Sequence, residues 1–341
     1  MIWLTWRQFR LQAFVVFGGV AALVAALAIT GPGLAELYHS GLAACQAHGS
    51  CSAFTTEFWR GHQGVFFGLA IVTMVVPGLL GLFWGAPLIA RELETGTHRL
   101  VWNQSVTRTR WLAVKLGLAG LSAMIAAGIV SAAVTWWSDP IQQTSAESPR
   151  LSPVLFAARD LTPVGYAAFA FALGAVTGML VRRTIPAMAV TLAVFVGIQL
   201  AMPLWIRPHL MPPVQTTVDI TAENLHGIGG GPAGMTSLDV ATDQAGAWIL
   251  SSVTVDRSGQ VVRTLPSWID DCMGPPRQES GVAQAQRACF SRLADSGYRQ
   301  RISYQPDSRF WLFQWLETGV FLVLTAGLCG FGFWWIRRRL S

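Results

Sequence analysis

Charged residues are scarce in this sequence. Only 12% of its 341 residues are Asp, Glu, Lys or Arg, whereas 52% are hydrophobic, and the mean hydropathy is +0.44. One water-soluble core of this length cannot bury so much apolar surface, so the composition excludes an ordinary soluble fold. Part of the chain must be solvated by a lipid bilayer.

Long stretches of the chain lack Asp, Lys, Arg and His altogether. A helix needs roughly 20 predominantly apolar residues to cross a bilayer. Six stretches meet this requirement, and the last contains one acidic residue, Glu317. The sequence therefore predicts an all-α polytopic membrane protein with six transmembrane helices. The stretches are Ala13–Thr30, Gly64–Ala90, Leu116–Ser138, Leu161–Val181, Thr184–Ile206 and Phe310–Ile336.

The first stretch has an alternative interpretation as a signal peptide, because Arg7 and Arg10 precede it. It is, however, longer than the about 7–15 apolar residues typical of a signal peptide, so we expect a span. Residues 1–12 also place three aromatic side chains beside these arginines. That pattern predicts a short helix at the inner membrane surface, with a frayed cytoplasmic end as the alternative.

Basic residues are distributed unevenly about the predicted spans. Cytoplasmic flanks retain Lys and Arg. With the N-terminus inside, twelve of the 24 basic residues face the cytoplasm against only Glu92 and Glu94, whereas fifteen acidic residues face outward. This asymmetry predicts a multi-pass plasma-membrane protein with both termini cytoplasmic. Because the basic residues are divided among short flanks, we expect no nucleic-acid binding.

Catalytic motifs are also missing. A Walker loop needs Gly-Lys followed by Ser or Thr, but Lys115, the only lysine, lies between Val114 and Leu116. The spans hold neither His nor Asp, which excludes intramembrane proteases built on these residues. We therefore expect a non-enzyme that binds no metal and no cofactor. Glu317 is a candidate pathway residue, or a carboxylate that merely reaches the outer interface.

The sequence has few cysteines, and four of its five are expected outside the membrane. Cys45 and Cys51 fall in the first outer loop, and Cys272 and Cys289 fall in the large outer segment, where disulfides can form. We predict the disulfides Cys45–Cys51 and Cys272–Cys289, with free thiols as the alternative.

Residues 207–309 are long enough for a small extracellular domain between the fifth and sixth helices. The Pro/Gly-rich stretch Pro208–Gly234 predicts irregular structure. Trp248–Val255 and Gln260–Leu265 flank a hairpin signal, and Gly281–Ala294 has a helical pattern. The expected organisation is five helices over 1–206, a mixed α/β insert over 207–309, and the sixth helix with a basic tail over 310–341.

Residues 91–115 form a polar, basic insert between the second and third spans. Its glutamates and arginines can make charged contacts at a protein interface, while Leu93, Leu100 and Trp102 can fill apolar pockets. The insert is thus a candidate docking element for a cytoplasmic partner. A solvated loop kept basic for topology is the alternative.

The motifs around this insert resemble those of the ABC-2 type permeases of bacterial export systems. The resemblance covers most of the chain and rests on the order of its motifs, although Ser105 and Val106 replace the family's usual proline region. The motifs are Phe83-Trp84-Gly85, Arg91-Glu92-x-Glu94-x-Gly96-Thr97, Gln104-Ser105-Val106-Thr107-Arg108, and the C-terminal segment from Tyr304 to Arg339.

The resemblance implies that segment 91–110 is a coupling helix seated in a cleft of an ATP-binding subunit. It further implies a homodimer in the bacterial cell membrane, with lipids around it and with ATP and Mg bound by the partner subunit. The expected cargo is an exported apolar or amphipathic compound such as a drug, antibiotic or lipid. The implied contact residues are Arg91, Glu92, Glu94, Gly96, Thr97, Arg99, Leu100 and Arg108.

Two other function classes remain open. A membrane sensor would bind a ligand with its outer domain and pass the signal inward without any cargo pathway. A membrane enzyme would place its chemistry in the outer domain, where His209 and His226 occur, but these residues have no metal-site or triad spacing.

Overall fold

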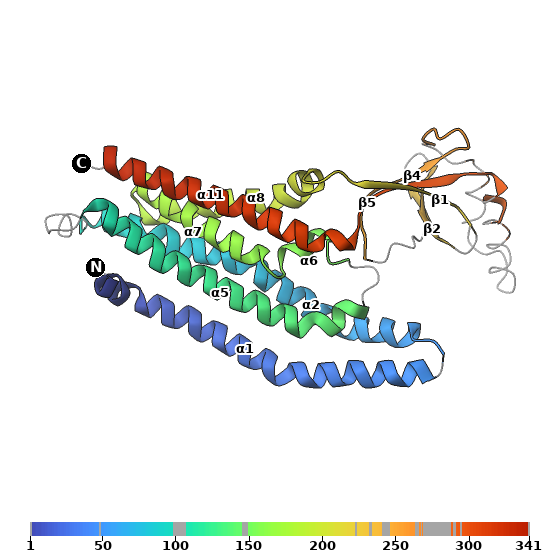
Figure 1. The fold of residues 1–341 in the computed structure, drawn as a ribbon, viewed down its shortest axis with the longest axis horizontal. Coiled ribbons are helices and arrows are strands. Elements are labelled where there is room, and N and C mark those ends of the chain that lie inside the picture. The colour runs from blue at the N-terminus through green and yellow to red at the C-terminus, as the bar shows by residue number, and fades with distance from the viewer. Residues whose placement is uncertain are drawn as a thin grey trace. The chain divides into compact units, whose positions relative to one another are not determined.

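The computed structural model divides into two compact units, Met1–Leu210 with Phe310–Ser341, and Met211–Arg309. Six helices are long and apolar enough to cross a membrane, as the sequence predicts. Figure 1 shows the helices of the first unit side by side, with both chain ends at one end of the bundle, here called the termini end. The structure describes residues 2–47, 49–97, 107–144, 149–221, 224–231, 234–240, 246–262, 266, 268, 288, 291–293 and 295–339.

The second span is built from three consecutive helical segments, α2, η1 and α3, of which η1 is a π-helix. Such π-helical turns are frequent at functional sites. A second π-helix, η2, follows α8 and leads into the 3₁₀ turn η3. The elements of the first unit are α1 (Ile2–Ala47), α2 (Ser52–Leu80), η1 (Gly81–Gly85), α3 (Ala86–Glu94), α5 (Arg108–Thr144), α6 (Pro153–Ala157), α7 (Thr162–Val181), α8 (Thr184–Ala201), η2 (Met202–Ile206), η3 (Arg207–His209) and α11 (Phe310–Arg338).

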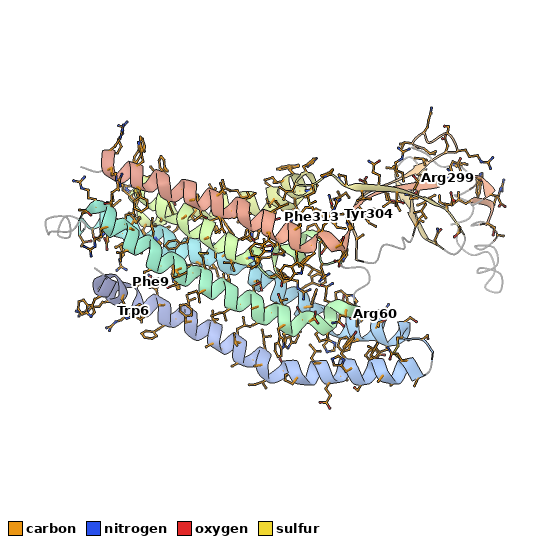
Figure 2. The ribbon with its side chains drawn as sticks, in the orientation of Figure 1. Trp6, Phe9, Arg60, Arg299, Tyr304 and Phe313 are labelled. Atoms are coloured by element: carbon orange, nitrogen blue, oxygen red, sulfur yellow. A yellow bond between two sulfur atoms is a disulfide. The ribbon has the colours of Figure 1, made fainter. Side chains whose placement is uncertain are left out.

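Helix α1 is much longer than its predicted span. It begins at Ile2, so the expected inner-surface helix forms its first turns, and it continues through Pro32 to Ala47. Trp6 and Phe9 mark its start at the termini end (Figure 2). At the other end of α1, a disulfide joins Cys45 to Cys51, the residue before α2.

The outcome for the predicted disulfides follows from these positions. The Cys45–Cys51 disulfide is confirmed, although Cys45 lies in the last turn of α1 rather than in a loop. The other predicted pair, Cys272 and Cys289, lies outside the described residues.

Helix α7 is the most enclosed span, and 83% of its apolar window is buried. Its sequence is apolar all round, which is typical of a helix with neighbours on every side. Pro163 in its first turn has the backbone angle that a helix start requires. The helix ends at Val181, and the next residue, Arg182, has a left-handed φ of 57° that turns the chain toward α8.

The helices at the periphery of the bundle, α1, α8 and α11, carry most of the exposed apolar surface. Only 17% of the apolar windows of α1 and α11 and 22% of that of α8 are buried, and large side chains such as Phe14, Leu200 and Val323 are exposed. A soluble protein of this kind would aggregate, whereas a bilayer solvates such surfaces. The first unit is therefore a multi-pass membrane domain.

The second unit contains two antiparallel sheets with the strand orders β1-β5-β4 and β2-β3. β4 matches the predicted strand Trp248–Val255, and it pairs with β5. In the second predicted strand, Gln260–Leu265, a single β-bridge joins Val261 to Val255. The prediction of irregular structure over Pro208–Gly234 was wrong, because β1 and β2 lie there. Most of Gly281–Ala294 lies outside the described residues. The strands are β1 (Val214–Asp219), β2 (Leu225–Gly231), β3 (Gly234–Val240), β4 (Trp248–Val255) and β5 (Arg299–Gln305).

Candidate functional site

The segment expected to contact an ATP-binding subunit lies at the termini end, where α3 stops. The hydroxyl of Thr95 donates to the carbonyl of Arg91 at 2.9 Å and closes the last turn. Gly96 follows with a φ of +73°, a conformation that glycine adopts without steric cost. The side chains of Arg91, Thr95 and Thr97 are exposed at this turn. Arg99 and Leu100 lie outside the described residues, and Arg108 is the first residue of α5.

Four glycines, two in η1 and two in α7, bring the helix that leads into this segment directly against α7. A Cβ atom at Gly174 would lie 2.4 Å from the carbonyl oxygen of Gly81, and one at Gly178 would lie 2.4 Å from that of Ala86. Likewise, a Cβ at Gly85 would lie 2.5 Å from the carbonyl oxygen of Phe171. Atoms cannot approach so closely, so this backbone-to-backbone crossing of η1 and α3 with α7 requires glycine. At these glycines the backbones of the crossing helices lie directly against one another.

Glu92 connects the same segment to α5. Its carboxylate forms an ion pair with Lys115, and the side chains are 14% and 4% exposed. The Lys115 ammonium also lies 4.8 Å from the centre of the Trp111 ring. A largely buried lysine needs a nearby anion to remain charged, so Glu92 fixes the position of α3 relative to α5.

Glu94 connects the segment to α8. Its Oε2 atom accepts hydrogen bonds from the Thr184 backbone N–H at 3.0 Å and from the Thr184 hydroxyl at 2.7 Å. Thr184 is the first residue of α8, so the carboxylate lies at a helix N-terminus, where negative charge is favourable. Glu92 and Glu94 are among the residues expected from the resemblance to contact another subunit, and both have partners within the chain.

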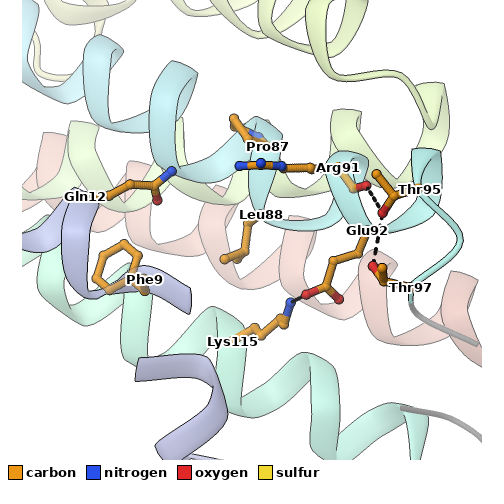
Figure 3. A pocket seen from close by; sticks show the side chains of 9 residues that line it. All are labelled: Phe9, Gln12, Pro87, Leu88, Arg91, Glu92, Thr95, Thr97 and Lys115. Atoms are coloured by element: carbon orange, nitrogen blue, oxygen red, sulfur yellow. Dashed lines mark hydrogen bonds and ion pairs between the residues drawn. The ribbon is translucent and has the colours of Figure 1, made fainter. Parts of the chain in front are cut away.

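A cavity of about 430 Å³ opens beside this segment. Figure 3 shows the Gln12 amide of α1 and the Arg91 guanidinium of α3 pointing toward one another across it, above the Glu92–Lys115 pair. Its walls combine apolar, neutral polar and charged groups. The lining residues are Phe9, Gln12, Pro87, Leu88, Arg91, Glu92, Thr95, Thr97 and Lys115.

Glu317 of α11, the candidate pathway residue, is fully buried and paired. Its carboxylate accepts from Nε and Nη2 of Arg207 at 2.7 and 3.0 Å, and it also accepts from the Tyr166 hydroxyl of α7. Arg207 has no exposed surface and stacks over the Phe156 ring of α6, 4.3 Å from its centre. The carboxylate thus joins α11, α7 and η3. The sequence did not predict its contacts with Arg207 and Tyr166.

Gln314, one turn before Glu317, adds a second polar connection. Its Oε1 atom accepts from the backbone N–H of Leu161 and of Thr162, at 3.1 and 3.0 Å, and from the Thr162 hydroxyl at 2.6 Å. It therefore caps the N-terminus of α7 with a side chain from α11. Over the described part of the chain, no group of three or more His, Cys, Asp or Glu residues is placed to hold a metal ion.

One comparison with known proteins gives a match. A family model described as ABC-2 membrane transporter related matches residues 17–207, which includes most of α1 and the whole of α2, α3, α5, α7 and α8. No curated protein and no solved structure matches the chain significantly.

Proposed function

The chain belongs to the ABC-2 membrane transporter related family, and we propose that it exports an apolar or amphipathic compound with energy from a separate ATP-binding subunit. Family membership makes it a multi-pass transporter permease and implies an ATP-binding partner in general. The match does not favour a sensor. The proposal, rather than the family match, supplies the cargo, the direction of transport and the docking site of the ATP-binding subunit.

The observation that carries the proposal is the set of connections made by α3. Its exposed turn at Thr95–Thr97 lies at the termini end, while its body contacts three spans through Glu92–Lys115, Glu94–Thr184 and the crossing at Gly174. A force applied to this turn would therefore be transmitted to α5, α8 and α7 together. Nucleotide-driven closure of an ATP-binding subunit would supply such a force.

The proposed assembly contains two copies of this chain and two ATP-binding subunits in a bacterial plasma membrane. ATP and Mg bind to the partner, and both termini of this chain face the cytoplasm. Loading of the ATP-binding subunits shifts the helices between inward-facing and outward-facing states by binding one state more tightly than the other. The positive charge at the termini end supports this orientation, since Arg337 and Arg338 lie there with Arg7 and Arg10.

The test is to purify the tagged protein from its native membrane in mild detergent and to measure by mass spectrometry which subunits co-purify. We expect an ATP-binding subunit in equal amount. Gly96→Val should reduce that amount about tenfold, the equivalent of about 1.4 kcal/mol, because a β-branched residue resists positive φ at the docking turn. Membrane insertion should be unchanged.

The matched control is Gly259→Val, which places the same strain at another glycine of positive φ, +83°, in the second unit. It should leave the co-purifying amount unchanged. A wild-type chain that purifies alone would refute the proposed partnership, and equal losses in both variants would refute the docking role of the α3 turn.

A further inference from the structure

The cavity beside α3 is lined by two chemically different kinds of group, and both α1 and the α3 segment supply each kind. Phe9, Pro87 and Leu88 offer apolar surface, whereas Gln12, Thr95 and Thr97 offer neutral hydrogen-bonding groups. A ligand that satisfies both kinds of group must itself be amphipathic. On α1, the neighbouring residues Leu11 and Phe14 are 73% and 66% exposed on faces of the helix turned away from Phe9, so this part of α1 presents apolar surface of the kind that a bilayer solvates.

The net charge of the lining residues is positive. Glu92 and Lys115 neutralise one another in their ion pair, which leaves the exposed guanidinium of Arg91. Within the described part of the chain, no carboxylate forms an ion pair with Arg91. An exposed guanidinium flanked by amide and hydroxyl groups is suited to a phosphate, which it can bind through two parallel hydrogen bonds.

The position of the cavity along α1 corresponds to the headgroup level of a bilayer. Phe9 and Gln12 each lie within about two turns of Trp6, and Trp3 lies one turn earlier; the Trp3 and Trp6 side chains are 68% and 45% exposed. Arg7 stacks on Trp3 at 5.4 Å. Tryptophan and arginine residues with this exposure are typical of the membrane–water interface.

We propose that this cavity binds an anionic phospholipid of the surrounding leaflet, with its phosphate at Arg91 and its acyl chain along Phe9 and Leu88. The lipid joins α1 to α3 across a gap that the protein alone leaves open. The binding site itself is independent of any partner subunit. Its consequence rests on the proposed function, because a lipid held by Arg91 restrains the same segment that an ATP-binding subunit would move.

The experiment uses the full-length protein, with any subunit that co-purifies, in nanodiscs of equal parts phosphatidylcholine and phosphatidylglycerol, without nucleotide. After mild detergent extraction, native mass spectrometry counts the retained lipids. Wild type should retain phosphatidylglycerol preferentially. Arg91→Gln should lower that retention about fivefold, the factor expected for one basic contact to an anionic lipid of about 1 kcal/mol. Arg338→Gln, at an exposed arginine that does not line the cavity, should leave it unchanged.

Three results would overturn the proposal. The first is equal retention of phosphatidylglycerol in Arg91→Gln and Arg338→Gln. The second is a wild-type protein that retains phosphatidylglycerol and phosphatidylcholine equally. The third is displacement of the lipid by millimolar inorganic phosphate, which would show that the site binds a soluble anion. If Arg91→Gln does not fold, Gln12→Leu on the opposite wall serves instead and should also lower retention. Because no nucleotide is present, failure here is distinct from failure to recruit an ATP-binding subunit.

Discussion

Arg207 and Glu317 are charged groups buried where neither can reach water. Their separation in sequence is 110 residues, yet two hydrogen bonds of 2.7 and 3.0 Å join them. Transfer of a single charge into such an environment is costly, and a well-aligned pair largely offsets that cost. The pair therefore stabilises the helix arrangement around α7, and Glu317 is not an isolated acid.

This pairing predicts an asymmetric response to substitution. Glu317→Leu leaves the Arg207 cation buried without its partner and should reduce stability by about 3–5 kcal/mol. The double variant Arg207→Leu/Glu317→Leu leaves no buried charge and should lose less than Glu317→Leu alone. Thermal unfolding of the detergent-purified protein measures both, with Glu36→Gln, at an exposed position of α1, as the control. Arg207→Leu is measured alone as well, and a double variant whose loss of stability equals the sum of the losses in Arg207→Leu and Glu317→Leu would contradict the pairing.

The sequence did not identify Arg207 as the partner of Glu317, because Arg207 directly follows the fifth apolar stretch and falls in the predicted outer segment. A signal was available. Glu317 is the only acidic residue in the six predicted spans, and a buried carboxylate requires a cation. A lone arginine directly after an apolar stretch is a candidate for that partner.

Glycine spacing decides how the elements approach one another. Three pairs at four-residue spacing occur in the predicted spans, Gly64/Gly68, Gly81/Gly85 and Gly174/Gly178. The second and third pairs face each other across the crossing of η1 and α3 with α7, whereas a Cβ at Gly64 or Gly68 would meet nothing within 4 Å. The same sequence pattern therefore has a packing role in two cases, whereas the third pair has no close neighbour among the described residues.

The variant Gly174→Ala tests the close crossing of η1 and α3 with α7. The added methyl group would lie 2.4 Å from the Gly81 carbonyl oxygen, so α7 must move away, at a cost of about 1–3 kcal/mol. Gly197→Ala on α8 meets nothing within 4 Å and should be neutral or stabilise by up to about 1 kcal/mol, since alanine favours helix. Melting temperatures in detergent report both changes, and an equal shift in the two variants would rule out a close crossing.

Over the whole molecule, the unequal distribution of basic residues predicts its orientation. Both chain ends lie at the termini end of the bundle (Figure 1), and positive flanks are retained in the cytoplasm. An epitope inserted at Ser258, in the exposed turn after β4, should bind antibody in intact cells. A C-terminal epitope should bind only after permeabilisation. Labelling of the C-terminal epitope in intact cells would show that the orientation is reversed.

The sequence by itself determined the membrane class, the six spans and the Cys45–Cys51 disulfide. In lipid every backbone polar group must be satisfied internally, so a long uncharged stretch has few alternatives to a helix. The two cysteines are close in the chain, and their proximity does not depend on the rest of the fold. Strand β4 was also predictable from its local pattern and the turn that follows, whereas the neighbouring glycines and prolines obscured β1 and β2.

Only the tertiary structure decided which residues meet. The contacts Glu92–Lys115, Glu94–Thr184 and Arg207–Glu317 and the crossing at Gly174 all join segments distant in sequence. Hydropathy specifies that a helix is buried in lipid or protein, but it carries little information about its neighbours, because apolar side chains pack with nearly equal gain against many partners. The choice of neighbours depends on a few polar groups that each need a partner and on glycines that allow close approach, and these requirements are met only when the helices are assembled.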